Sequence, residues 1–119
     1  MSTNDNYLAV FLGSKANMQA WMALPEAERR AKEQQGIAAW KAWIQKNQAA
    51  MVSMGGPLGK TKRITPRGIE DVSNELSAFM VVRAQSAEAA AKLFENHPHF
   101  TIFPGDAVEV MPVLPIPEG

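Results

Sequence analysis

Two short segments, residues 7–12 and 78–82, are apolar at every position, and they constrain the fold more than any other feature of the sequence. Short apolar runs rich in β-branched and aromatic side chains are typical of strands. Successive side chains of a strand point to opposite faces, so an apolar residue at every position indicates a strand covered on both faces. The chain is therefore expected to bury both sides of a sheet that contains these two segments.

A helix is predicted after the second of these strands. Ser86 is a good N-cap, because its hydroxyl can accept from the free N–H groups of a first helical turn. Pro98 disfavours helical backbone at the residue before it, so the helix is expected to end near Asn96. Its core-facing residues recur at helical spacing: Ala87, Ala90, Leu93 and Phe94.

A longer helix is predicted from about Pro25 to Asn47, with proline at the first helical position and acidic residues in the first turn. Gly36 interrupts it and marks either a kink or a close approach of another part of the chain. The apolar stripe of this helix is Ile37, Trp40, Trp43 and Ile44.

The remaining elements are shorter. A short helix is expected at residues 17–22, and strands are expected at 51–54 and 107–111. Residues 58–75 form an excursion, in which Pro66-Arg67-Gly68 is a strong turn signal for a small hairpin.

The order of these elements predicts an α+β, ferredoxin-like βαββαβ fold with a four-stranded antiparallel sheet. Two helices can cover only one face of such a sheet, yet two strands are apolar on both faces. A bare apolar sheet face would exceed the few hundred Å² that monomers tolerate. A homodimer in which the bare faces meet is therefore expected.

The chain of 119 residues is most simply one domain, residues 1–119. Residues 1–6 are polar and expected to be flexible. The tail, residues 112–119, is apolar but punctuated by proline, so it is expected to be extended and to pack against something.

Twelve basic and twelve acidic side chains cancel, so there is no overall charge to attract nucleic acid or an anionic membrane. The chain has no cysteine, which fits a reducing compartment. Its N-terminus lacks a basic-then-apolar signal pattern, and no apolar run reaches membrane-spanning length. A cytoplasmic protein is the expectation.

The segment from Asn74 to Phe100, followed by P-G-D-A-V-E-V-M-P-V, resembles the YCII-related family of small bacterial proteins, and G-G-P-L-G-K-T-K resembles a segment of one branch. The resemblance implies the dimeric α+β barrel fold. In some members, a histidine near the first helix and an aspartate just before a proline are proposed as an active-site pair. Here His97 stands before that proline, and neither histidine lies near the first helix, so that activity is not carried over.

Both histidines lie in the corner His97-Pro98-His99. His97 is the candidate catalytic residue, a general acid or base at a pocket mouth, because imidazole titrates near neutrality. The alternative is that His97 caps the last carbonyls of the preceding helix. His99 is a candidate ligand-binding residue. A metal site would need a third ligand from Glu95, Asp106 or Glu109, and no metal or cofactor is predicted.

Two further ligand-binding candidates are Lys60 and Trp21. Gly59-Lys60-Thr61 ends like a phosphate loop, but Met54 stands where that motif needs glycine, so a nucleotide-hydrolysing enzyme is rejected. Lys60 can still supply positive charge to a small anion, or belong to a solvated basic loop. Trp21 precedes the long helix and suits a pocket wall, whereas Trp40 has the spacing of an ordinary core residue.

The leading functional hypothesis is a small-molecule enzyme with a pocket between helices and sheet and His97 as acid or base. The alternative is a non-catalytic ligand-binding module, or a structural partner domain, that uses the same dimeric fold.

Overall fold

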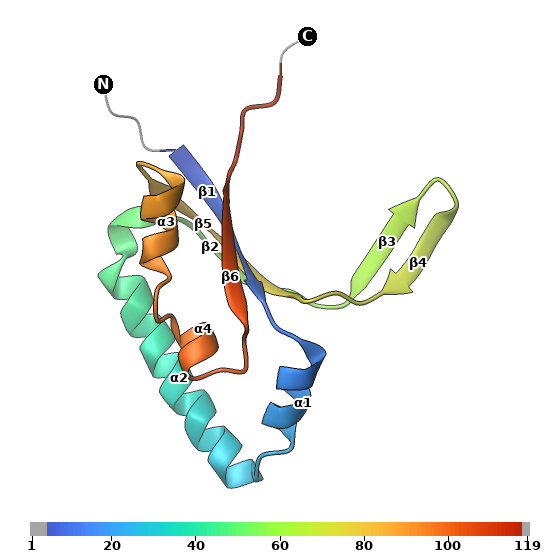
Figure 1. Ribbon diagram of the computed structural model, residues 1–119, viewed down its shortest axis with the longest axis vertical. Coiled ribbons are helices and arrows are strands. Elements are labelled where there is room, and N and C mark those ends of the chain that lie inside the picture. Colours follow the sequence, from blue (N-terminus) through green and yellow to red (C-terminus); the bar gives the residue numbers. More distant parts are fainter. Residues whose placement is uncertain (1–4, 118–119) are drawn as a thin grey trace.

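The computed structural model describes residues 5–117 and has the predicted order of elements, including the hairpin, together with a short helix, α4, that was not predicted (Figure 1). The elements are β1 (Asp5–Leu12), α1 (Lys15–Met22), α2 (Glu26–Lys46), β2 (Met51–Pro57), β3 (Thr61–Thr65), β4 (Gly68–Val72), β5 (Leu76–Ala84), α3 (Ala87–Leu93), α4 (Pro98–Thr101) and β6 (Ala107–Pro112), with a 3₁₀ turn at Gln48–Ala50. None of these helices is long and apolar enough to cross a lipid bilayer.

The four strands of the main sheet lie in the order β2-β5-β1-β6, and all neighbours are antiparallel. The two segments that are apolar at every position therefore form the central pair, β1 and β5. Their register pairs Ala9 with Met80 and Val10 with Phe79. Each of these two strands has a neighbouring strand on both sides. The most apolar strands of a chain are usually found at such central positions, because they are the best covered.

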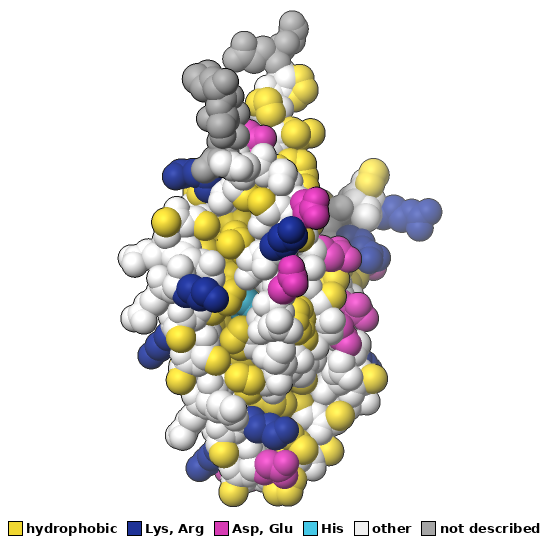
Figure 2. Space-filling model, turned by 60° about the vertical axis from the view of Figure 1, so that its left-hand side comes forward, with side chains coloured by type: hydrophobic (Ala, Val, Ile, Leu, Met, Phe, Trp, Pro, Cys, Tyr) yellow, Lys and Arg dark blue, Asp and Glu magenta, His cyan; other side chains and the backbone are white. Residues whose placement is uncertain are grey.

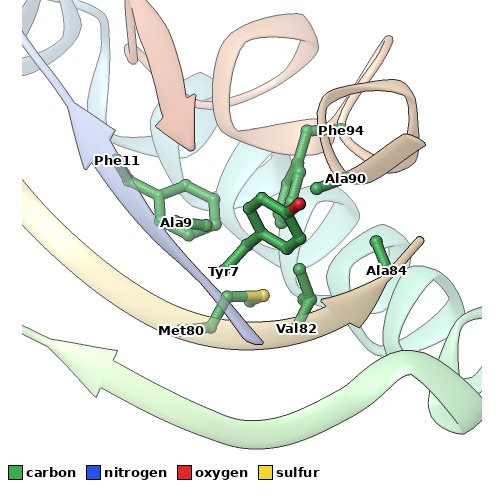
Figure 3. Packing of buried hydrophobic residues seen from close by; sticks show 8 residues of the cluster. All are labelled: Tyr7, Ala9, Phe11, Met80, Val82, Ala84, Ala90 and Phe94. Atoms are coloured by element: carbon green, nitrogen blue, oxygen red, sulfur yellow. The ribbon is translucent and has the colours of Figure 1, made fainter. Parts of the chain in front are cut away.

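The hydrophobic core lies between this sheet and the helices (Figure 3). Alternate residues in the middle of the central strands are buried there, in one cluster with Ala90 and Phe94, which lie on or just after α3. The strand residues of this set are Tyr7, Ala9, Phe11, Met80, Val82 and Ala84. The alternate residues Leu8, Val10, Phe79 and Val81 point to the other face and are only partly buried. The helices thus cover one face of the sheet, as predicted.

The helix after β5 begins as predicted and ends early. The Ser86 hydroxyl accepts from the Ala89 N–H at 3.0 Å, which confirms the N-cap. The end predicted near Asn96 is wrong, because α3 stops at Leu93. The Phe94 N–H donates to the Ala91 carbonyl, which tightens the chain into a turn, and Asn96 then has φ 59°. Asparagine tolerates this left-handed backbone, so the chain turns toward α4.

The long helix α2 is continuous across Gly36. A Cβ atom on Gly36 would meet the ring of Phe103 at 2.5 Å, so this glycine marks a close approach rather than a kink. Trp40 and Trp43 pack against the core as the apolar stripe predicted. Ile37 and Ile44 of the predicted stripe do not belong to this packing, and half of the Ile37 surface is exposed.

The strand predicted to stop at Met54 continues to Pro57. Its pairing with β5 shifts register between Met51 and Gly56, which is the pattern of a β-bulge. The strand therefore continues past its two glycines. Gly55 has φ 58°, and a Cβ there would collide with the Phe79 carbonyl. Only glycine fits that position.

The predicted excursion contains the hairpin β3–β4, which stands away from the rest of the chain (Figure 1). Ile64 and Ile69 pair across it, and each is 71% exposed. The radius of gyration is 16.5 Å, against about 13.5 Å expected for a compact domain of this length. The projecting hairpin and tail account for the excess.

The chain ends differ from the predictions in two respects, the start of β1 and the packing of the tail. Strand β1 begins at Asp5, so it includes two residues of the segment 1–6 that was predicted to be flexible. Residues 1–4 and 118–119 lie outside the described residues. The tail is extended as expected: the Val113 N–H donates to the Asn6 carbonyl, and Leu114 and Ile116 then lie exposed. The tail finds no cover within the described part of this protomer.

Candidate active site

A cavity of about 510 Å³ opens between α2, the β2–β5 side of the sheet and the segment that follows α4. Apolar side chains make up most of its wall, among them Met18, Trp40, Met54, Met80 and Phe103. On the face shown in Figure 2, hydrophobic side chains form a long band, and only a small patch of histidine surface is visible within it. The volume of the cavity and its mostly apolar wall are those of a small-molecule site.

Within residues 5–117, the cavity is lined by one hydroxyl, one imidazole and one ammonium side chain: Ser77, His99 and Lys41. The Ser77 hydroxyl already donates to the Phe11 carbonyl at 2.9 Å. The chemistry of the cavity therefore depends on His99 and Lys41.

His99 lies at the second position of α4 and is 7% exposed. Its Nε2 lies 2.8 Å from the Leu12 carbonyl oxygen. A carbonyl oxygen can only accept, so Nε2 carries the proton and Nδ1 is the proton-accepting nitrogen of the neutral ring. A Cβ on Gly105 would collide with this ring, so the glycine makes room for it.

Burial lowers the pKa of His99 below 6.5, because desolvation disfavours the charged ring. The hydrogen bond to Leu12 and the nearby Asp106 carboxylate oppose this shift without reversing it. His99 is therefore a neutral imidazole at pH 7.

His97 has no exposed surface. Its Nδ1 accepts from the His99 N–H at 3.0 Å, so His97 is the N-cap of α4. The alternative prediction, that it caps the last carbonyls of the preceding helix, is wrong. The reason is local: the chain turns at Asn96, so His97 already belongs to the start of the next helix.

The His97 ring lies in a box of aromatic side chains. Its nearest ring centroids are those of Trp40, at 4.5 Å, and Trp43, at 4.7 Å, both edge-on. Phe11 and Phe94 complete the box. Its Nε2 has no hydrogen-bond partner among the described residues. Burial lowers the pKa of His97 to about 4, and the positive charge that His99 carries when it is protonated contributes to this shift. Trp40 faces both His97 and the cavity, whereas the His97 ring does not line the cavity.

The other two predicted site residues do not line this cavity. Trp21 is half-buried and packs against Phe103, with ring centroids 5.9 Å apart, so it backs the cavity wall rather than lining it. Lys60 lines a separate hollow of about 440 Å³ at the base of the hairpin, together with Asp71 and Asn74.

Sequence reasoning missed Lys41, Phe103 and Gly105. Lys41 follows Ile37 by four residues, so a lone cation on the apolar stripe of α2 was the available signal. Gly36 was the signal for Phe103, because it marked a close approach without naming the partner. Gly105 carried none, since Pro104-Gly105 reads as an ordinary turn.

Asp106, named above as a possible metal ligand, has a structural role. Its carboxylate accepts from the Ser14 N–H and from the Asn17 side-chain amide, which joins the start of α1 to the start of β6. Within residues 5–117, no group of three or more histidine, aspartate or glutamate side chains is arranged to hold a metal ion.

Among solved structures, the chain resembles 5-chloro-2-hydroxyhydroquinone dehydrochlorinase (TftG) from Burkholderia phenoliruptrix AC1100, in its complex with 2,5-dihydroxybenzoquinone. The TM-score is 0.52 and the sequences are 18% identical, over 89% of this chain and 90% of that chain. No family model matches the chain, and no curated protein matches its sequence. At this identity the likeness shows the fold alone: an α+β chain with a four-stranded antiparallel sheet, as predicted.

Proposed function

We propose that this single-domain protein is a small-molecule enzyme in which His99 takes a proton from, or returns one to, a ligand in the cavity. One observation carries the proposal. A neutral imidazole with one nitrogen engaged by the Leu12 carbonyl forms part of the wall of an otherwise mostly apolar cavity. A positioned imidazole of this kind is the commonest general acid–base group in enzymes.

The catalytic role predicted for His97 passes to His99 in this proposal. A ring with no exposed surface cannot exchange a proton with a ligand in the cavity unless its surroundings rearrange. His97 instead acts as a positioning residue, because its Nδ1 accepts from the backbone N–H of His99. Trp21 supports the cavity wall through Phe103, and Lys60 has no part in the reaction.

The structural neighbour supports this class of function. TftG is a dehydrochlorinase, and its complex holds a small quinone ring. That chemistry belongs to TftG, and we take from it only that the same fold can enclose a small molecule. We also propose that the chain belongs to the YCII-related branch and acts in the cytoplasm.

We propose a homodimer as the working form. The sheet face opposite the helices carries Leu8, Val10, Phe79 and Val81, which are only partly buried in the protomer. Such a face is commonly buried in a twofold homodimer, because the same apolar patch of both copies then forms the interface. The exposed tail residues can then find cover on the second copy.

The experiment starts from a thermal-shift screen of the full chain with small aromatic and carbonyl compounds. Turnover of each stabilising compound is then compared between the wild type and His99→Gln. We expect the variant to keep binding and to lose about 100-fold or more in turnover, the size of a general acid–base contribution. Lys46→Met, at the exposed end of α2, is the control and should keep full turnover.

Two outcomes contradict the proposal. Equal turnover in His99→Gln would remove His99 from the chemistry. Stabilising compounds that the wild type never converts would favour the alternative, a non-catalytic ligand-binding module.

A further inference from the structure

Besides His99, Lys41 is the one ionisable side chain that lines the cavity, within the residues that the structure describes. It lies on α2 next to Trp40, and it forms no ion pair among residues 5–117. The nearby acidic residue Asp106 is engaged by Ser14 and Asn17 and is not part of the cavity wall. The wall therefore carries one unmatched positive charge.

The aromatic side chains on the wall restrict the body of the ligand. Trp40 and Phe103 line the cavity with ring centroids 6.0 Å apart and planes inclined at 66°. A flat ring can lie on the face of one and against the edge of the other, the two arrangements that aromatic pairs prefer. A cation would also suit aromatic faces, but Lys41 would repel it.

The backbone restricts the kind of anion. Polyphosphate sites use several free backbone N–H groups that point at the ligand. The Gly13 N–H donates to the Glu75 carbonyl, and the Gly105 N–H donates to the His99 carbonyl, each at 2.9 Å. These two glycines on the cavity wall thus offer no free donor, which favours an anion that one lysine can satisfy.

We propose, resting on the function proposed above, that the cavity takes an aromatic molecule with a single negative charge, a carboxylate or a phenolate, and that Lys41 binds this charge. In the phenol case the O–H bond breaks, its proton moves to Nδ1 of His99, and the electron pair stays on the phenolate oxygen beside Lys41. In the carboxylate case the charge is present before binding.

The test measures binding to the full-length protein by calorimetry at pH 7, with 2-naphthoate, 2-naphthol and the neutral 2-naphthamide as probes. We expect the wild type to bind 2-naphthoate or 2-naphthol about fivefold more tightly than 2-naphthamide, as one solvent-accessible ion pair allows. Lys41→Met should abolish this preference and leave 2-naphthamide binding unchanged. Lys41→Arg and the control Lys46→Met should keep it, and added salt should weaken it.

The two anion classes separate in the same data. A preference for 2-naphthoate assigns a carboxylate. A preference for 2-naphthol, with the absorption spectrum of the ionised naphtholate in the complex, assigns a phenolate. Equal binding of all three probes, no binding of any, or equal weakening of all three by Lys41→Met would overturn the inference. A preference that depends on Lys41, with no turnover of any compound, would overturn the proposed function and leave this inference standing.

Discussion

The Nδ1 atom of His97 accepts a hydrogen bond from the backbone N–H of His99 at 3.0 Å. The bond lies wholly inside the protein and joins the two histidines at the start of α4. It requires an unprotonated Nδ1 on His97, and it orients the backbone that carries the His99 ring to the cavity. His97 therefore positions the backbone of His99, and burial of the His97 ring among aromatic side chains keeps that ring neutral.

Replacing His97 tests this arrangement. His97→Ala removes the acceptor for the His99 N–H and leaves a void among four aromatic rings. We expect the free energy of unfolding to fall by about 3 kcal/mol, the range for a lost cap combined with a core cavity. Urea denaturation measures the change. Glu95→Ala, an exposed neighbour, should stay within about 0.5 kcal/mol of the wild type. An equally small effect of His97→Ala would show that the bond is not structural.

The stability of the protein should depend on pH through the same ring. His97 binds its proton near pH 6.5 when unfolded and near pH 4 when folded. Between these values the unfolded chain binds more protons, so stability rises with pH and is lost as the pH falls from 6.5 toward 4. The lowered pKa of His99 acts in the same direction.

The measurement is the free energy of unfolding between pH 4 and pH 7, compared with His97→Asn, which cannot titrate there. The wild type should show the steeper slope in this window, by up to about 1.4 kcal/mol per pH unit. Comparison with the variant removes the contribution of the carboxylates. Equal slopes would mean that His97 is protonated in the folded state, against the burial that the structure shows.

Much of the fold could be predicted because local signals agreed with the final packing. The segments that are apolar at every position became the central strands, and the Ser86 hydroxyl capped the helix it preceded. The hairpin was expected from Pro66-Arg67-Gly68, and its strands Thr61–Thr65 and Gly68–Val72 are joined there, with Gly68 as the first residue of the second strand.

The site was harder to predict because it depends on contacts between residues distant in the sequence. His97 and His99 are two residues apart, yet one faces the core and the other the cavity. That difference follows from the backbone of Asn96 and the short helix after it. The sequence alone does not show which lysine, Lys41 or Lys60, lines the cavity. Lys41 does so only because α2 packs against the sheet, whereas Lys60 lines the hollow at the base of the hairpin.

Gly105 offers a test of how closely the His99 ring is held. A methyl group on this residue would collide with the imidazole. We expect Gly105→Ala to cost about 1–3 kcal/mol of unfolding free energy, as overpacking does, and to disturb the bond from His99 to Leu12. Denaturation and the imidazole NMR resonances report the two effects. Gly59→Ala is the matched control, because nothing lies within 4 Å of a Cβ there. Unchanged His99 resonances in Gly105→Ala would contradict the predicted contact.

The proposed dimer rests on the face of the sheet that the helices leave uncovered, and Val10 lies near its centre, opposite Phe79 in the register. Val10→Lys would place a charge on this face. Because burying an unpaired charge is costly, the two copies should separate rather than bury it. Light scattering at micromolar concentration should return a dimer for the wild type and a monomer for Val10→Lys. Ala42→Lys adds the same charge at an exposed position of α2 and should stay dimeric.

A wild-type monomer would remove the dimer proposal. A dimeric Val10→Lys would move the contact away from the sheet, and the hairpin with Ile64 and Ile69 would be the next surface to mutate, since both side chains are highly exposed.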